Sequence, residues 1–455
     1  MLSDRVLNRE ILRLSVPSIL ANLTVPLVGM VDTALAGHLP GGQAAAFIGG
    51  ISVGSMLLNL LYWNFFFLRT GTGGLTAQAF GRQDPRECAR IFLRGTGFAL
   101  MVAVLLVSIQ VPFARVASML FNASPRVSEL AMRYYFIRIW AAPATLTLMV
   151  LRGWFVGMQD SMSSMWTDLV VNVVNIIASV VLSFGAFGWQ GMGFDGIPLG
   201  TVAAQYTGLV FASLVCAVKY GKTTFTGIKP RDMAELLHWR DLGPYLKMNG
   251  NLMGRSICFT VIYMGFTMIA AGFGDLLLAC STIMMQLLMF FSYFTDGFAY
   301  AGEALSGRFI GGRDQVMLRR TVKYVFVWSM AIALLSVFLY WWLGVPAMRL
   351  FSSDAEVVGA CSRFLPWLLI MPPLGCAAFT WDGIYLGATE SGSLFISMIG
   401  AMVCFLGLWF LLGPRQPAGS DTCLHILLAA YFSHLAFRTF WLSAMYGRKV
   451  KHLAG

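Results

Sequence analysis

The residues of this chain that could do chemistry are charged and amide side chains set inside long apolar stretches. Asp32 lies in the apolar segment Pro26–Ala34, with no Lys or Arg within one helical turn. A carboxylate inside a membrane helix is costly, so one that is present is a candidate for binding and releasing a proton. Pro26 lacks a backbone N–H and could bend the helix. The alternatives are that Asp32 caps neighbouring polar groups or faces water near a helix end.

A second group of polar residues could complete a binding site with Asp32. Asn172 and Asn175 lie one turn apart, and Thr201 opens the next apolar segment. These side chains could form a polar wall opposite Asp32 for a proton or a substrate. Asn in a membrane helix also often serves only to hold helices together.

Other charged residues lie within apolar segments and could be structural or gating charges. Arg255 and Asp296 lie at similar depth by residue count, so they could pair. Asp296 and Glu303 are seven residues apart and share a helix face. We favour structural ion pairs as the role of the set, which comprises Arg69, Arg152, Arg255, Asp296, Glu303 and Asp382.

Neither a metal site nor a bound cofactor is predicted. The five histidines show no ligand spacing, and the eight cysteines include no C-x-x-C pair. The chain has no G-x-x-x-x-G-K-[ST] phosphate loop, which excludes ATP-driven pumping within it. It also lacks the group of His, Asp or Ser at a membrane face that a lipid-modifying enzyme would need. We therefore expect no enzymatic activity.

The elements that position these residues are membrane-spanning helices. The chain has 455 residues, of which 58% are hydrophobic and 12% charged, against roughly 25% charged in ordinary soluble domains. A spanning helix needs about 20 mostly apolar residues. The sequence predicts an all-α integral membrane protein whose first segment is a retained helix, with twelve transmembrane helices at 11–37, 46–79, 91–113, 127–151, 163–186, 197–218, 241–271, 276–306, 320–343, 357–380, 392–413 and 424–446.

The net charge of +11 is explained by the placement of the basic residues. Lys and Arg gather at the amino terminus, in the second, sixth and eighth connections and in the carboxyl tail, whereas the odd-numbered connections hold few. Basic loops stay in the cytoplasm. We therefore expect both termini to be cytoplasmic, in the inner membrane of a bacterium, and no nucleic-acid partner.

An internal repeat divides the chain. At an offset of 230 residues, Ala77–Asp160 aligns without gaps with Gly307–Glu390, and identical pairs include Gly153 with Gly383 and Gly157 with Gly387. Turn formers and helix-packing residues are what a shared backbone path retains. The repeat predicts an amino-terminal lobe at 1–218, a cytoplasmic linker at 219–240 and a carboxyl-terminal lobe at 241–455, with six helices in each lobe.

Because each half holds an even number of helices, the two lobes share one orientation. Parallel repeats of this kind occur in transporters that use alternating access. Duplicated bundles also occur in channels and membrane enzymes, although no filter or pore repeat is evident. The repeat makes Arg152 and Asp382 equivalents of opposite charge, so a gate contact between the lobes is an alternative to structural pairing.

Several short motifs carry a family resemblance over essentially the whole chain. Val31-Asp32-Thr33, Phe67-Leu68-Arg69, the Thr-Ala-Gln-Ala-Phe-Gly run at 76–81 and Trp381-Asp382-Gly383 followed by Gly387 resemble the multidrug and toxic compound extrusion (MATE) family, in its DNA-damage-inducible-protein-F (DinF) branch. The resemblance implies antiport of an organic, often cationic, compound against H⁺ or Na⁺. It also implies that Asp32 is the coupling carboxylate, with Asn175 and also Asn172 and Thr201 as companions.

One departure from the family pattern favours H⁺ as the coupling ion. Many relatives have a second carboxylate where this chain has Ser179, and no acid lies between Pro244 and Ala271. A Na⁺ site prefers several hard oxygen ligands, so Na⁺ is the less favoured ion. The nearest alternative function is a lipid or lipid-linked oligosaccharide flippase of the same superfamily. We expect a monomer whose partners are the lipid bilayer and small organic substrates.

Overall fold

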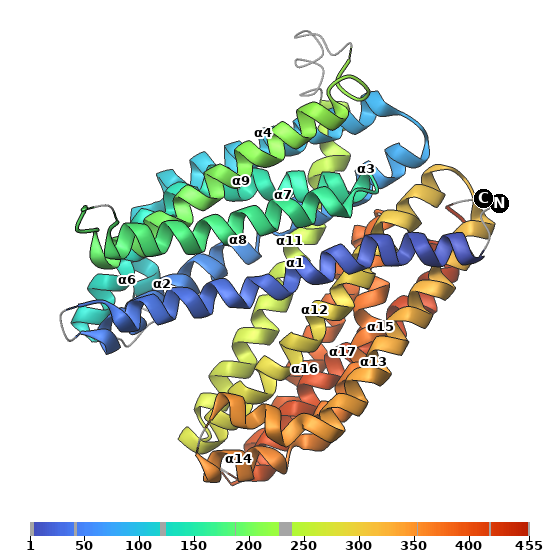
Figure 1. Ribbon diagram of the computed structural model, residues 1–455. Coiled ribbons are helices and arrows are strands. Elements are labelled where there is room, and N and C mark those ends of the chain that lie inside the picture. The colour runs from blue at the N-terminus through green and yellow to red at the C-terminus, as the bar shows by residue number, and fades with distance from the viewer. Residues whose placement is uncertain are drawn as a thin grey trace. The chain divides into compact units, whose positions relative to one another are not determined.

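The computed structural model describes residues 4–40, 43–118, 124–186, 188–226, 239–352, 354–417 and 420–453, which are helical apart from short connections (Figure 1). Most of the predicted linker, residues 227–238, lies outside this range. The helices before the linker are α1 (Asp4–His38), α2 (Ala44–Trp63), α3 (Phe67–Gly81), α4 (Pro85–Ser108), α5 (Gln110–Ser118), α6 (Pro125–Arg138), α7 (Ala142–Gly157), α8 (Ser161–Phe184) and α9 (Gly196–Tyr220).

The helices after the linker repeat this order. They are α11 (Trp239–Ala271), α12 (Asp275–Gly311), α13 (Gln315–Phe351), α14 (Ala355–Ser362), α15 (Leu365–Gly387), α16 (Ser391–Leu412) and α17 (Asp421–Lys449). Among the described residues, 11 helical segments are long and apolar enough to cross a membrane, and the α14–α15 pair, bent by 54°, makes a twelfth if it counts as one span. The prediction of an all-α membrane protein with twelve spans is confirmed.

Besides the predicted span at 357–380, which divides between α14 and α15, three predicted helices are broken rather than continuous. The span at 91–113 divides at Ile109, three residues before Pro112, and the span at 127–151 contains a 3₁₀ turn at Ile139–Ala141 before Pro143. The Pro ring clashes with the carbonyl four residues earlier, so each break falls where that clash would arise. The span at 46–79 divides at a turn between α2 and α3.

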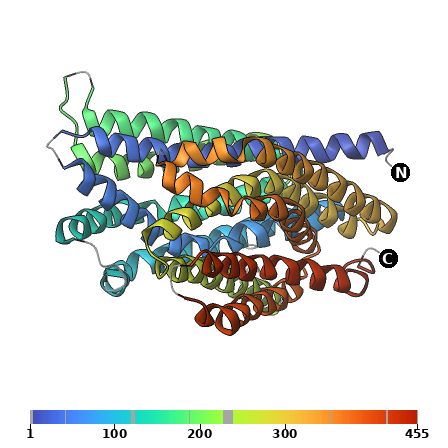
Figure 2. The same cartoon turned by 90° about the horizontal axis from the view of Figure 1, so that it is seen from below.

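The chain forms two compact units, Leu20–Gly243 and Met1–Ile19 with Pro244–Gly455. In the first unit, α3 packs on α4 and α7, and α8 packs on α9. In the second, α12 packs on α13 and α15, and α16 packs on α17. The same pairs of equivalent helices therefore pack in both units. Both ends of the described chain lie at one end of the second unit in Figure 1 and in the turned view of Figure 2.

The closest helix crossings confirm the repeat at the level of single atoms. A Cβ added at Gly153 would lie 2.1 Å from the carbonyl oxygen of Arg69, and one at Gly383 would lie 2.0 Å from that of Ala299. Positions 69 and 299 differ by the same 230 residues as 153 and 383. Only glycine lets the two backbones approach this closely.

The turns between helices repeat as well. In the described part of the chain, the non-glycine residues with positive φ are Gln83, Arg313, Gln159 and Thr389, which form two pairs at the repeat offset. Positive φ is uncommon for residues with a Cβ. The helix starts that follow the first pair are capped alike, since the Asp84 and Asp314 carboxylates each accept a backbone N–H three residues on.

Asp160, which lies outside the membrane-spanning segments, links the start of α8 to the end of α9. Its carboxylate accepts hydrogen bonds from Lys219 Nζ and from the Tyr220 hydroxyl, both at 2.8 Å. Burial by itself raises the pKa of Asp160, but the hydrogen bonds from Lys219, Ser163 and Tyr220 outweigh it and lower the pKa overall. A carboxylate held in its charged form here ties the start of α8 to the end of α9.

Helix α1 contributes to both units. It runs without interruption from Asp4 to His38, through Pro26, so a bend at that proline stays a prediction. Residues up to Ile19 belong to the unit formed by the carboxyl-terminal helices, whereas the predicted lobe boundary placed the whole of α1 with the amino-terminal half. A Cβ at Gly297 of α12 would lie 2.4 Å from Ile19 Cγ1, which shows how closely this part of α1 packs there.

Candidate functional site

Asp32 lies two turns from the end of α1 and is 5% exposed. Its Oδ1 atom is buried and accepts no hydrogen bond within the part of the chain that the structure describes. A buried carboxylate oxygen without a donor is costly in its charged form. The position therefore suits a group whose charge changes during function better than a permanent structural anion.

A cation that sequence inspection missed lies within electrostatic range of this carboxylate. The charge of Arg138, at the end of α6, interacts with that of Asp32. Arg138 Nη1 donates to the hydroxyl of Tyr134 at 2.5 Å, and Ser55 Oγ lies 3.2 Å from the same hydroxyl. The Tyr62 hydroxyl of α2 is within the electrostatic reach of Arg138 as well. Asp32 thus belongs to a polar cluster built from α1, α2 and α6.

The predicted companions of Asp32 form two separate contacts. Asn175 Nδ2 of α8 donates to Thr201 Oγ1 of α9 at 2.8 Å, and both residues are buried. Asn172 Nδ2 donates to Thr24 Oγ1 of α1 at 2.5 Å. No hydrogen bond within the described residues joins Asp32 to these side chains. Asn175 Oδ1 is buried and accepts no hydrogen bond among those residues, so it keeps a free acceptor.

The structure gives a steric reason for the serine at position 179. Ser179 is fully buried, and its Oγ donates to the carbonyl of Ile197 at 3.3 Å. A Cβ at Gly200 would lie 2.4 Å from Ser179 Oγ, which places the serine in the closest part of the α8–α9 crossing. A longer carboxylate side chain has no room there without a shift of α9.

The carboxyl-terminal unit contains an ion cluster that differs from one pairing considered possible from the sequence. Arg255 of α11 pairs with Asp382 of α15 and not with Asp296. Arg438 of α17, which is 1% exposed, donates to the same Asp382 oxygen and lies over the ring of Phe379, with 6.0 Å between the guanidinium carbon and the ring centroid. Depth along two helices does not reveal which helices are neighbours, and here α15 and α17 are.

In the amino-terminal unit, the charge of Arg152 is neutralised by a carboxylate of the same unit. Arg152 Nε lies 2.6 Å from Asp168 Oδ1 of α8, and the charge of Arg69 acts on the same carboxylate. Arg69 is also stacked over Phe66, with 5.5 Å between the guanidinium carbon and the ring centroid. Arg152 and Asp382, equivalents of opposite charge, are therefore each paired within their own unit.

The remaining predicted charges lie on α12. Glu303 is 1% exposed, and its backbone carbonyl would be 2.3 Å from a Cβ added at Gly387. Asp296 interacts electrostatically with Tyr293 one turn earlier. Among the described residues no group of three or more His, Cys, Asp and Glu side chains could hold a metal ion.

Comparison with known proteins agrees with this architecture. The MatE family model matches residues 17–181 and 252–411, one segment in each half of the chain. The chain belongs to the MATE family. DNA damage-inducible protein F of Escherichia coli (strain K12) is 32% identical over 401 residues, which cover 88% of this chain and 84% of that protein. This relative confirms the DinF branch.

More distant relatives are similar to this MATE chain over part or most of its length. The chloroplastic protein DETOXIFICATION 44 of Arabidopsis thaliana is 23% identical over 89% of this chain and 76% of its own length. Multidrug resistance protein MdtK of Klebsiella pneumoniae is 27% identical over 47% of this chain and 46% of its own length. A solved MATE structure in a bent conformation superposes with a TM-score of 0.86 at 16% identity, covering 99% of each chain, which shows the shared fold.

The MATE chain also holds intramembrane charges that the motif search passed over. Arg138, Asp168 and Arg438 lie inside the helices predicted at 127–151, 163–186 and 424–446. Each forms a charge interaction with a residue that had been singled out, namely Asp32, Arg152 and Asp382. A complete inventory of charges within the predicted spans would have found all three.

Proposed function

We propose that this MATE-family transporter exports small organic compounds, often cationic, in exchange for protons. The protein alternates between states that are open to opposite sides of the membrane, and Asp32 carries the coupled proton. In one state the carboxyl group is protonated and neutral. In the other it has released the proton and can bind the positive charge of a substrate.

The observation that carries this proposal is the environment of Asp32. The carboxylate is buried, its Oδ1 accepts no hydrogen bond from the described residues, and its charge interacts with that of Arg138. The buried carboxylate of Asp382, in contrast, has two Arg side chains in direct contact. Direct pairing holds Asp382 as an anion, whereas Asp32 is available for exchange.

The choice of H⁺ over Na⁺ follows from the supply of oxygen ligands. Na⁺ requires several hard oxygens around one point. Ser179 stands where many relatives have a second carboxylate, and its hydroxyl donates to a backbone carbonyl. No hydrogen bond among the described residues joins Asn172, Asn175 or Thr201 to Asp32. A proton needs only the Asp32 oxygen.

The breadth of substrates rests on a relative. The Klebsiella pneumoniae protein, 27% identical over part of the chain, is a multidrug resistance protein. We extend this activity to the present transporter, which we place as a monomer in the inner membrane of a bacterium. No enzymatic step forms part of the proposed cycle.

Transport in proteoliposomes tests the proposal. A fluorescent organic cation is followed under an imposed pH gradient or an imposed Na⁺ gradient. We expect movement driven by the pH gradient and a loss of at least tenfold in Asp32→Asn, because an amide cannot exchange a proton. The matched control is Asp84→Asn, an exposed helix cap at which Asn caps as well as Asp; it should transport like the wild type.

Several results would contradict the proposal. Dye movement driven only by Na⁺ would overturn the coupling ion. Undiminished transport by a folded Asp32→Asn protein would overturn the role of Asp32. No dye movement under either gradient, together with translocation of a fluorescent phospholipid, would replace export with the flippase function.

A further inference from the structure

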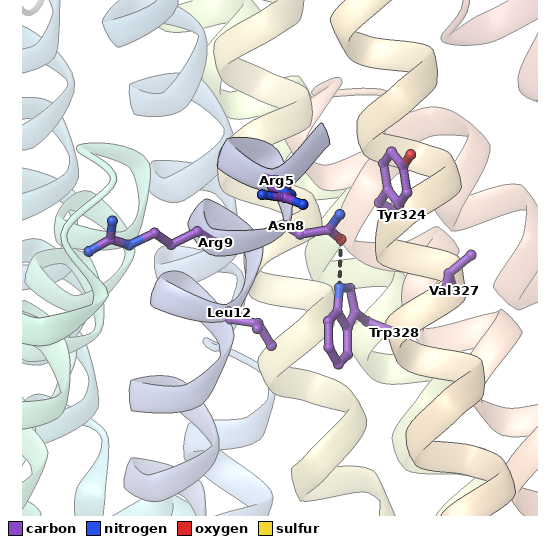
Figure 3. Close-up of a pocket in the computed structure, with 7 residues that line it drawn as sticks. All are labelled: Arg5, Asn8, Arg9, Leu12, Tyr324, Val327 and Trp328. Carbon is purple, nitrogen blue, oxygen red and sulfur yellow. Dashed lines mark hydrogen bonds between the residues drawn. The ribbon is translucent and has the colours of Figure 1, made fainter. Parts of the chain in front are cut away.

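We propose that a recess between the start of α1 and α13 is a binding site for a phospholipid with an anionic headgroup. The recess belongs wholly to the carboxyl-terminal unit and is lined by Arg5, Asn8, Arg9, Leu12, Tyr324, Val327 and Trp328 (Figure 3). This site does not depend on the proposed transport cycle.

The recess is formed by one face of each helix. On α1 the lining residues stand at positions 5, 8, 9 and 12, and on α13 at 324, 327 and 328, the spacing of neighbours on one helical face. Trp328 Nε1 donates to Asn8 Oδ1 at 2.8 Å across the gap, as Figure 3 shows. Asp4 and Arg320 form a second link, at 3.6 Å. The walls are therefore joined, and the groove between them is preformed.

The charges at the recess are unbalanced in favour of an anion. The acids Asp4 and Glu10 of α1 are paired with Arg320 and with Arg308. Arg5 and Arg9 are exposed, and no acid among the described residues pairs with either. Figure 3 shows Arg5 beside Asn8, whereas Arg9 extends away from α13. The flexible Arg9 side chain can swing onto a phosphate bound beside Arg5.

Further basic residues line the same end of α13. Arg319, Arg320 and Lys323 all fall within its first three turns. A basic pocket between membrane helices at the headgroup level is the arrangement that binds anionic lipid headgroups. The charge of this end of the unit therefore selects an anionic headgroup over a zwitterionic one.

The rest of the recess suits an acyl chain. Leu12, Val327 and the Trp328 ring supply its apolar lining. Val327 is 53% exposed, and exposed apolar side chains continue along α13 at Leu334 and Phe338. A phosphate held by arginines at the membrane boundary with an apolar track running inward matches a phospholipid. A soluble phosphate compound would leave the apolar track unused.

Native mass spectrometry of the full chain in detergent tests the site. The protein is titrated with dioleoylphosphatidylglycerol and with dioleoylphosphatidylcholine. We expect the wild type to prefer the anionic lipid and Arg5→Ala/Arg9→Ala to bind it roughly twentyfold more weakly, given the headgroup attraction of each Arg. The matched control is Arg82→Ala/Arg86→Ala, two exposed arginines with the same spacing beside another helix start; it should keep the preference.

A second variant distinguishes binding in the apolar groove from electrostatic attraction alone. Val327→Trp fills the apolar part without changing any charge and should weaken binding of both lipids. The proposal is overturned if the wild type shows no preference for the anionic lipid or if Arg5→Ala/Arg9→Ala keeps it. Equal loss in the control pair, or no effect of Val327→Trp, would also overturn it, because the attraction would then be general to basic surfaces.

Discussion

At the scale of single residues, the buried charges of this transporter fall into two kinds. Asp382 touches the guanidinium groups of Arg255 and Arg438. Asp32 has only the longer-range charge of Arg138 and one oxygen without a hydrogen bond among the described residues. Direct pairing makes a buried charge permanent, whereas its absence leaves the group free to change protonation. The difference separates residues that hold the fold from the residue that we assign to coupling.

The Asp382 cluster provides a test at this scale. Asp382→Asn leaves the buried Arg438 and the partly buried Arg255 beside a neutral amide, and we expect it to destabilise the protein by about 3–5 kcal/mol. Asp421→Asn is the control, since its pair with Arg363 is exposed and is expected to contribute under about 1 kcal/mol. Thermal unfolding of the purified proteins in detergent compares them.

A double variant makes the Asp382 test sharper. Asp382→Asn with Arg438→Met removes one buried cation together with the anion and should recover part of the lost stability. If Asp382→Asn melts like the wild type, the cluster does not stabilise the fold. If the double variant is worse than the single one, Arg438 stabilises its surroundings by packing rather than by charge.

At the scale of elements, the crossing of α3 with α7 and that of α12 with α15 are the same contact made twice. In each, glycines of the later helix lie against carbonyl oxygens of the earlier one, Gly153 on Arg69 and Gly383 on Ala299. Carbonyls that approach this closely leave no room for a side chain. Helix starts and turns after these crossings repeat as well, so the duplication extends from packing to backbone conformation.

Alanine at either crossing is expected to cost stability. Gly153→Ala and Gly383→Ala each place a Cβ 2.1 and 2.0 Å from a carbonyl oxygen, and forced separation of the helices costs about 1–3 kcal/mol or more. Gly97→Ala and Gly407→Ala are the controls in the same two units, because nothing lies within 4 Å of a Cβ there. Their higher helix propensity should leave the melting temperature equal or slightly raised.

Similar melting temperatures for all four variants would show that the α3–α7 and α12–α15 pairs can separate without loss. A loss in only one of Gly153→Ala and Gly383→Ala would show that the two crossings, alike in geometry, differ in how far their helices can shift.

At the scale of the whole molecule, the even number of spans and the placement of the basic residues both predict that the two termini lie on the same side of the membrane. Both ends of the described chain lie at the same end of the carboxyl-terminal unit (Figure 1). The basic residues gather at the amino terminus, in the even-numbered connections and in the carboxyl tail. Since basic segments resist export across the membrane, these regions are expected in the cytoplasm.

Reporter fusions measure this topology. Green fluorescent protein joined after Leu453 should fluoresce, and alkaline phosphatase at the same point should be inactive, because we expect this end in the cytoplasm. Fusions after Gln190, in the connection between α8 and α9, should give the opposite pair of results. Active phosphatase after Leu453 would show that the chain has the opposite orientation in the membrane. The same reporter results after Leu453 and after Gln190 would show that α9 and the helices after it do not cross the membrane an odd number of times.

The sequence by itself determined which parts of this protein cross the membrane and that the chain is duplicated. Both are local properties, since a span is a run of apolar residues and a repeat is a register between two segments. It also singled out Asp32, because an acid in an apolar helix stands out without any knowledge of its neighbours.

Only the tertiary structure decided which charges meet. By depth, Arg255 could have paired with Asp296, but it contacts Asp382, together with Arg438. Residue spacing gives the depth of a side chain along its own helix, whereas partners depend on which helices pack together and which faces they turn to one another.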